Sequence, residues 1–193
     1  TFFVTVSLTG VHDGQPMLRS AARVGDVVAV TGYLGSSAGG LELLLHHGQA
    51  RAEAAHYLAQ AHRRPVPCVE EGRVLAAGGV RAAMDISDGL VDDLGKLCQA
   101  SGVAATIEAA QVPVHPFLRE TFPQRYLELA LGGGEDYQLL FTAPEAVAGA
   151  VLPKLPQAAI IGKIVKGEPG RVTVLGPSGQ VLPVAHGGWD HFR

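Results

Sequence analysis

Residues 84–96 read Met-Asp-Ile-Ser-Asp-Gly-Leu-Val-Asp-Asp-Leu-Gly-Lys, and Asp85, Ser87 and Asp88 are grouped at the start of this stretch. Side chains two residues apart in an extended segment point the same way, so Asp85 and Ser87 share a face. Asp88 opens a helix, whose first N–H groups and dipole favour anions. Because carboxylates suit Mg²⁺ and N–H groups suit phosphate, this corner could hold a magnesium-bound phosphate. The same residues also fit a doubly capped surface helix, with Ser87 or Asp88 as the N-cap.

A strand and a helix must hold this corner in place. A strand predicted over residues 80–84 delivers Asp85, and a helix follows the corner, ending where Gly102 supplies a C-terminal stop. The apolar residues of that helix recur at helical spacing, which gives it a core side. They are Leu90, Val91, Leu94, Leu97 and Cys98.

A second notable stretch covers residues 131–142, Leu-Gly-Gly-Gly-Glu-Asp-Tyr-Gln-Leu-Leu-Phe-Thr. Three glycines permit a backbone path closed to other residues and let a ligand approach closely. A buried strand is predicted over residues 137–142. The stretch is not a P-loop, because no Gly-Lys-Ser/Thr follows the glycines. Taken alone, it also fits an ordinary loop.

Together these stretches resemble a known family. Asp-Ile-Ser-Asp-Gly-Leu (85–90), followed by Asp93 and Leu94, is similar to the signature of the C-terminal domain of thiamine-monophosphate kinases. Gly-Gly-Glu-Asp-Tyr-x-Leu-Leu-Phe (133–141) resembles that family's second hallmark, in the expected order and at the expected separation. The superfamily also includes aminoimidazole ribonucleotide synthetase and selenophosphate synthetase, which carry other sequences at the first turn.

The resemblance implies transfer of the terminal phosphoryl group of ATP to thiamine monophosphate, giving thiamine diphosphate. It implies Mg²⁺ as cofactor and ATP as co-substrate. No catalytic base is expected, because the acceptor phosphate is already ionised at neutral pH, and the main task is electrostatic. The implied contacts are Asp85 and Asp88 with Mg²⁺, Arg19 and Ser87 with ATP, and Glu135 and Trp189 with thiamine monophosphate.

Three of these roles have plain structural alternatives. The guanidinium group of Arg19 suits phosphate oxygens, but an arginine that simply lies on the surface fits the sequence as well. Glu135 could contact a cationic thiazolium ring, or it could be an acid of an ordinary loop that faces water. Trp189, in a tail similar to the family's closing Gly-aromatic-x-His-Phe, fits stacking on a cationic heterocycle or an edge aromatic closing the core.

The composition is that of an ordinary globular chain. It has 193 residues, 47% hydrophobic and 17% charged, with a formal net charge of −3. No apolar run is long enough to cross a membrane, and neither a signal peptide nor a membrane association is expected. Scattered Lys and Arg give no footprint for nucleic acid. Cys68 and Cys98 form no disulfide or zinc pattern, which favours the cytoplasm.

The order of elements predicts an α/β (α+β) layered domain, a mixed β-sheet flanked by helices, resembling the C-terminal domain of aminoimidazole ribonucleotide synthetase. The other expected strands are residues 1–9, 27–31, 104–108 and 160–165, with a hairpin of 172–175 and 181–184. The other expected helices are residues 36–47, 49–63, 70–77, 117–122, 124–131 and 144–151. The glycines at 39 and 40 predict close packing of their helix or a close backbone approach to it.

The chain begins at Thr1 inside a predicted strand. The resemblance therefore implies that residues 1–14 are a remnant strand and linker from an N-terminal ATP- and Mg-binding domain, and that residues 15–193 are the C-terminal domain. It implies a homodimer for the full-length protein and a fragment inactive by itself. Two other functions stay open: a non-catalytic nucleotide- or thiamine-binding module, and another ATP-dependent synthetase of the superfamily.

Overall fold

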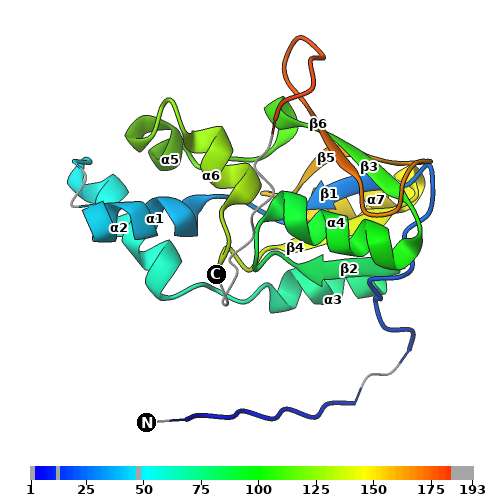
Figure 1. Ribbon diagram of the computed structural model, residues 1–193. Helices are drawn as coiled ribbons and strands as arrows, with labels where there is room; N and C mark the ends of the chain where they lie inside the picture. Colours follow the sequence, from blue (N-terminus) through cyan, green and yellow to red (C-terminus); the bar gives the residue numbers. More distant parts are fainter. Residues whose placement is uncertain (1–2, 12–13, 47–48, 184–193) are drawn as a thin grey trace.

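The computed structural model describes residues 3–11, 14–46 and 49–183 (Figure 1). The strands are β1 (Val27–Val30), β2 (Ala82–Asp85), β3 (Ala104–Glu108), β4 (Leu139–Ala143), β5 (Ala159–Val165) and β6 (Val172–Leu175). The helices are α1 (Ser36–His46), α2 (Ala52–Arg63), α3 (Val69–Ala77), α4 (Leu90–Ser101), α5 (Pro116–Thr121), α6 (Tyr126–Gly132) and α7 (Glu145–Val151), with 3-10 turns η1 (Ala109–Gln111) and η2 (Leu152–Lys154).

The strands form one six-stranded sheet in the order β2-β4-β1-β5-β3-β6. All neighbours pair antiparallel except β3 and β6, which run parallel. The predicted mixed sheet flanked by helices is confirmed. The expected hairpin is reduced to one antiparallel bridge between Leu175 and Val181, and its last predicted residue, 184, lies outside the described residues.

Strand β1 is buried on both of its faces, between helices that lie on either side of the sheet (Figure 1). Alternate side chains of a strand point to opposite faces. Val28 and Val30 join a core with the apolar residues of α4, whereas Val27 and Ala29 join a second core with α3 and α7. A strand that is apolar on both sides belongs in the middle of such a layered domain. The predicted apolar face of α4 is therefore confirmed as its core side.

Helices α1, α2, α5 and α6 gather beyond one end of the sheet (Figure 1). Glycines let α1 approach its neighbours closely, as the sequence predicts. A Cβ atom at Gly40 would collide with the backbone carbonyl of Leu58 in α2, and one at Gly39 would collide with the Leu118 side chain of α5. A side chain at Gly40 would push α1 and α2 apart, whereas one at Gly39 would force the Leu118 side chain to shift. This packing fixes the position of the α1 N-terminus.

Two predicted strands need correction. Residues 3–9 form no strand, because no neighbouring strand within the described chain pairs with them; Phe3 and Leu8 are exposed. The strand predicted from residue 137 begins at Leu139 instead. Its first predicted residue, Tyr137, has φ of +50°, which is incompatible with an extended strand. Among the described residues, no helix is long and apolar enough to cross a bilayer.

Candidate functional site

The corner, residues 85–90, joins the end of β2 to the start of α4. Gly89 is the N-cap residue of α4 with φ of +118°, a value that favours glycine, and no side chain caps the helix. The prediction that Ser87 or Asp88 is the N-cap is therefore wrong. Instead the carboxylate of Asp93, one turn into α4, folds back and accepts the N–H groups of Ser87 and Asp88, each at 2.9 Å. This leaves the side chains of Ser87 and Asp88 free of the capping role.

Lys96 lies beside the corner and pairs with two carboxylates, that of Asp88 at the corner and that of Asp93 in α4. Its ammonium group donates to Asp93 Oδ1 at 2.7 Å and also to Asp88. The Asp93 side chain is fully buried, whereas that of Asp88 is 47% exposed. Burial lowers the pKa of Lys96, but its bonds to the two carboxylates outweigh this effect and raise the pKa above its ordinary value. Lys96 therefore stays charged and balances the acids at the corner.

The two sequence hallmarks are joined by backbone hydrogen bonds. Strands β2 and β4 pair antiparallel with Asp85 opposite Leu139, and the pairing continues beyond the strands. Ile86 N–H donates to the Gln138 carbonyl (2.8 Å), and Tyr137 N–H donates to the Ile86 carbonyl (2.9 Å). Glu135 N–H donates to the Ser87 carbonyl at 2.9 Å. The segment 132–138, hereafter the acidic loop, is thus held against the corner.

Glycines make this close approach possible. A Cβ atom at Gly134 would collide with the Ser87 carbonyl, and one at Gly89 would lie 2.8 Å from the Gly132 carbonyl. Real Cβ atoms do not approach an oxygen so closely, so a side chain at either position would force the corner and the acidic loop apart. The sequence predicted that these glycines let a ligand approach closely; in the structure it is the chain's own backbone that makes the close approach.

The side chain of Asp136 anchors the acidic loop to helix α1. Its two oxygens accept N–H groups at the start of α1, from Gly35, the residue before the helix, at 2.5 Å and from Ser37 at 3.1 Å. Burial raises the pKa of Asp136 to about 7, although the backbone N–H groups at the start of α1 act in the opposite direction. A carboxylate at a helix N-terminus is also favoured by the helix dipole.

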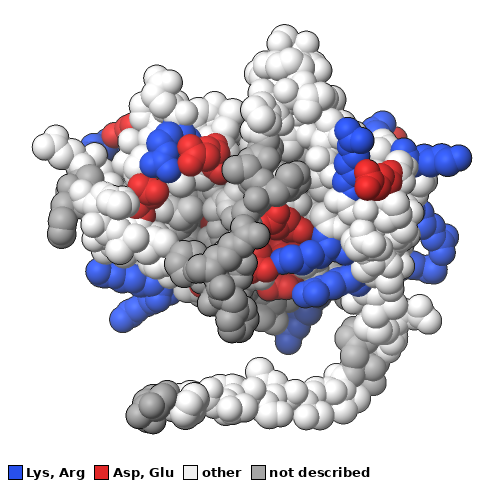
Figure 2. All heavy atoms as spheres, in the orientation of Figure 1, with Lys and Arg blue, Asp and Glu red and all other residues white. Residues whose placement is uncertain are grey.

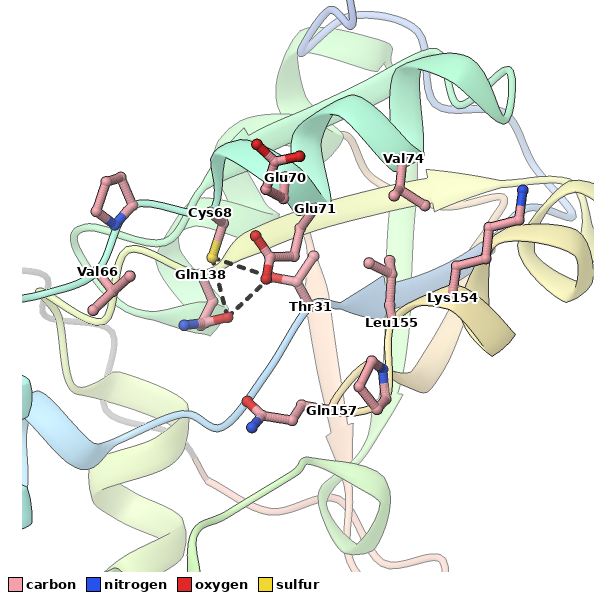
Figure 3. Close-up of a pocket in the computed structure, with 12 residues that line it drawn as sticks. Thr31, Val66, Cys68, Glu70, Glu71, Val74, Gln138, Lys154, Leu155 and Gln157 are labelled. Atoms are coloured by element: carbon pink, nitrogen blue, oxygen red, sulfur yellow. Dashed lines mark hydrogen bonds between the residues drawn. The ribbon is translucent and has the colours of Figure 1, made fainter.

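Gln138 anchors the other end of the acidic loop (Figure 3). Its side-chain oxygen accepts the hydroxyl of Thr31 at 3.0 Å and the thiol of Cys68 at 3.4 Å. The three side chains point toward one another in the wall of a cavity of about 340 Å³, closed on another side by Leu155 and Gln157. The loop is therefore fixed to β1 and to the start of α3 as well as to α1.

Glu135 and Tyr137 are presented on the other side of the loop. The Tyr137 hydroxyl donates to Glu135 Oε1 at 3.2 Å. Burial raises the pKa of Tyr137, and the negative charges of Glu135, Asp85 and Asp88 raise it further. All three carboxylates therefore act on one hydroxyl group. Figure 2 shows acidic side chains gathered near the centre of this face, with basic side chains beside them.

Four of the six predicted site residues are thus brought together: Asp85, Ser87, Asp88 and Glu135. Arg19 lies elsewhere, because its backbone carbonyl accepts the hydroxyl of Ser101 (2.8 Å) at the last residue of α4. A helix of this length separates Arg19 from Ser87 by about 18 Å along its axis. Trp189 lies outside the described residues. Within the described ranges no group of three or more His, Cys, Asp or Glu side chains is arranged to hold a metal ion.

Sequence reasoning assigned no role to Asp93, Lys96, Asp136 or Tyr137. A signal existed for Asp93, since an acid that shares the apolar face of Leu90, Leu94 and Leu97 must find partners inside. No comparable signal exists for Asp136, because its partner Gly35 is 101 residues away in the chain.

Comparisons with known proteins agree with this architecture. A sequence profile described as AIR synthase related protein, C-terminal domain, matches residues 23–175. Thiamine-monophosphate kinase of Escherichia coli K12 is 37% identical over 193 residues, covering 95% of this chain and 58% of that protein. The enzyme of the same name from Bacillus subtilis is 40% identical over 142 residues, covering 72% and 43%. The chain therefore spans about half the length of these relatives.

Solved structures of related proteins have a similar fold. AaThiL complexed with AMPPCP and TMP superposes with a TM-score of 0.78 at 37% identity, covering 92% of this chain and 55% of that one. E. coli HypE, a hydrogenase maturation protein, superposes with a TM-score of 0.71 at 20% identity, a likeness that concerns the fold alone. The profile matches most of the chain, and the two hallmarks lie at the ends of neighbouring strands, β2 and β4. This chain therefore belongs to the family of AIR synthase related proteins, as a C-terminal domain of that family.

Proposed function

We propose that this chain is part of a thiamine-monophosphate kinase and helps to transfer the terminal phosphoryl group of ATP to thiamine monophosphate. The observation that carries the proposal is the backbone pairing between the corner and the acidic loop. It sets Glu135 beside Asp85 and Asp88, although about fifty residues separate them in the chain. Relatives with this name, and a structure of AaThiL complexed with AMPPCP and TMP, support the same substrates.

Asp85 and Asp88 are the proposed Mg²⁺ ligands. Both are half-buried oxygen donors at the end of β2, where they act on a common neighbour. Mg²⁺ is usually held by one or two carboxylates, with water and substrate phosphates completing its shell. A pair of carboxylates without a third protein ligand fits that donor set. When bound, the ion would offset the charge of the phosphate oxygens.

The remaining residues bind and orient the substrates. Ser87 is proposed as an ATP contact at the corner, where its N–H group is already bonded to Asp93, and Arg19 is proposed as a more distant ATP contact. Glu135, exposed and negative, is proposed to attract the cationic thiazolium ring. No base is required, because the acceptor phosphate oxygen carries charge at neutral pH. Trp189 is retained as a proposed stacking partner for the substrate rings.

The wider organisation follows the same proposal. Residues 1–14 are proposed to belong with a preceding ATP- and Mg-binding domain, and residues 15–193 form the C-terminal domain. The exposed apolar side chains of Phe3, Val6 and Leu8 support this division, since such residues are usually covered. A homodimer and a cytoplasmic location are proposed for the whole protein. Cys68 and Cys98 are free, as a reducing compartment would leave them.

A coupled assay for ATP consumption with thiamine monophosphate tests this function. We expect Mg²⁺-dependent turnover by the protein expressed from the complete reading frame and none by the 193-residue chain. Unphosphorylated thiamine is the matched control substrate, because it lacks the acceptor phosphate. Absence of turnover by the complete protein, with ATP–Mg²⁺ and thiamine monophosphate both bound in calorimetry, would identify a binding module instead. Robust turnover by the 193-residue chain would refute the proposed division of labour.

Metal binding has a separate test that does not depend on turnover. We expect Asp88→Ala to weaken binding of Mn²⁺, followed by electron paramagnetic resonance in the presence of ATP, by about tenfold or more. Glu145→Ala, a surface acid at the start of α7, is the control and should bind as the unmodified protein does. Equal Mn²⁺ affinity in both variants would remove Asp88 from the proposed metal site.

A further inference from the structure

Consecutive side chains of the acidic loop alternate between two sides. Asp136 and Gln138 are tied to the body of the domain, one to the start of α1 and the other to Thr31 and Cys68. Glu135 and Tyr137 are not tied to these elements. Instead, they contact each other on the side that faces the corner. The loop therefore works as a rigid support that presents two neighbouring polar side chains.

The backbone conformation of this pair is unusual. Among the described residues, Glu135 (φ +67°) and Tyr137 (φ +50°) are the ones with positive φ that are not glycine. Such conformations are unfavourable for residues with side chains, and they persist where the surroundings hold them in place. Here the anchors on Asp136 and Gln138 do so, together with the N–H bonds of Glu135 and Tyr137 to the corner. Strain maintained at both presented residues indicates that their exact placement has a use.

The Tyr137 hydroxyl group is placed to control the Glu135 carboxylate. Glu135 is an exposed side chain with several rotamers, and ordering it on binding would cost conformational entropy. A hydroxyl donor at 3.2 Å restricts that freedom before any ligand arrives. The Glu135 backbone is meanwhile held against the corner by its N–H bond to the Ser87 carbonyl, so backbone and side chain are both fixed.

We propose that Tyr137 is a positioning residue of the substrate site: its hydroxyl group holds the Glu135 carboxylate in the orientation that binds the cationic half of thiamine monophosphate. This inference rests on the proposed function, since it needs Glu135 to contact that substrate. It assigns to Tyr137 an effect on thiamine monophosphate affinity that acts through Glu135 and leaves ATP affinity unchanged.

The test is a double-mutant cycle in the protein expressed from the complete reading frame. Calorimetry measures the Kd for thiamine monophosphate and for ATP–Mg²⁺ in the unmodified protein, Tyr137→Phe, Glu135→Gln and the double variant. We expect Tyr137→Phe to weaken thiamine monophosphate binding about three- to tenfold, as loss of one hydrogen bond predicts. In the Glu135→Gln background the same change should have less than about a twofold effect, because the carboxylate through which it acts is gone. Tyr126→Phe, at the start of α6, is the matched control.

The outcomes separate the two proposals. If the unmodified protein does not bind thiamine monophosphate, the proposed function itself fails. If it binds and Tyr137→Phe has no effect, or has the same effect with and without Glu135, the positioning role is refuted while the function stands. Equal weakening of thiamine monophosphate and ATP–Mg²⁺ binding would also refute it, since that pattern indicates general damage to the loop.

A measurement without ligand covers the case in which Tyr137→Phe does not fold. Ultraviolet titration of the 193-residue chain follows tyrosine ionisation. Glu135→Gln removes a negative charge next to the Tyr137 hydroxyl, so one tyrosine should ionise at lower pH in this variant. An unchanged titration curve would show that the two side chains do not interact in solution.

Discussion

Replacement of Asp93 by alanine tests how the corner is built. Asp93 Oδ2 accepts the N–H groups of Ser87 and Asp88, and Oδ1 accepts Lys96. The side chain is fully buried, so its removal leaves two N–H groups without their acceptor. A hydrogen bond to a charged group contributes about 1.5–3 kcal/mol, and part of this loss is recovered if water enters. We therefore expect Asp93→Ala to lower the free energy of unfolding by roughly 2–4 kcal/mol.

Urea denaturation followed by circular dichroism measures this difference. Asp88→Ala is the matched control, because Asp88 binds the same lysine but is 47% exposed. Loss of an exposed ion pair should cost no more than about 1 kcal/mol. Asp93→Asn should fall between the two, since its amide oxygen can accept the N–H groups but its amide nitrogen faces Lys96. The reasoning is refuted if Asp88→Ala is as destabilising as Asp93→Ala, or if Asp93→Ala changes stability by less than about 0.5 kcal/mol.

Three further predictions concern the supports of the site. Gly35→Ala should destabilise by more than Gly102→Ala in thermal denaturation: both have positive φ, but only at Gly35 would a Cβ meet backbone, 2.7 Å from the Ala130 nitrogen. Burial raises the pKa of Asp136 to about 7, so between pH of about 4 and 7 the folded chain keeps a proton that the unfolded chain releases. The free energy of unfolding should therefore fall as the pH rises through this range. Asp136→Asn should make that dependence on pH less steep. Leu94→Ala, at a fully buried position of α4, should cost about 2–5 kcal/mol in urea denaturation; a loss below 1 kcal/mol would contradict its place in the core.

Much of the fold could be predicted because local patterns carry it. Helix α4 was expected from apolar residues at helical spacing and a terminal glycine, and it ends at Gly102 in the left-handed conformation. Strand β1 was expected from a short apolar run and is buried on both faces. The prediction of an N-terminal strand was wrong, because a strand forms only where a neighbouring strand offers hydrogen-bond partners. Residues 3–9 have the composition of a strand but no neighbour to pair with in the described chain.

At the site, the residue types of the corner and of the acidic loop, and the glycines that let the two meet, can be read from the sequence. It did not determine which acids face the site. Asp85, Asp88, Asp93 and Asp136 have the same chemistry, yet the first two are the proposed metal ligands, whereas Asp93 and Asp136 accept backbone N–H groups and anchor the fold. The role of each acid depends on the fold, because the fold sets which N–H groups come within hydrogen-bond reach of each carboxylate. For Asp136 those groups come from a helix 99 to 101 residues earlier in the chain, beyond the reach of any local pattern.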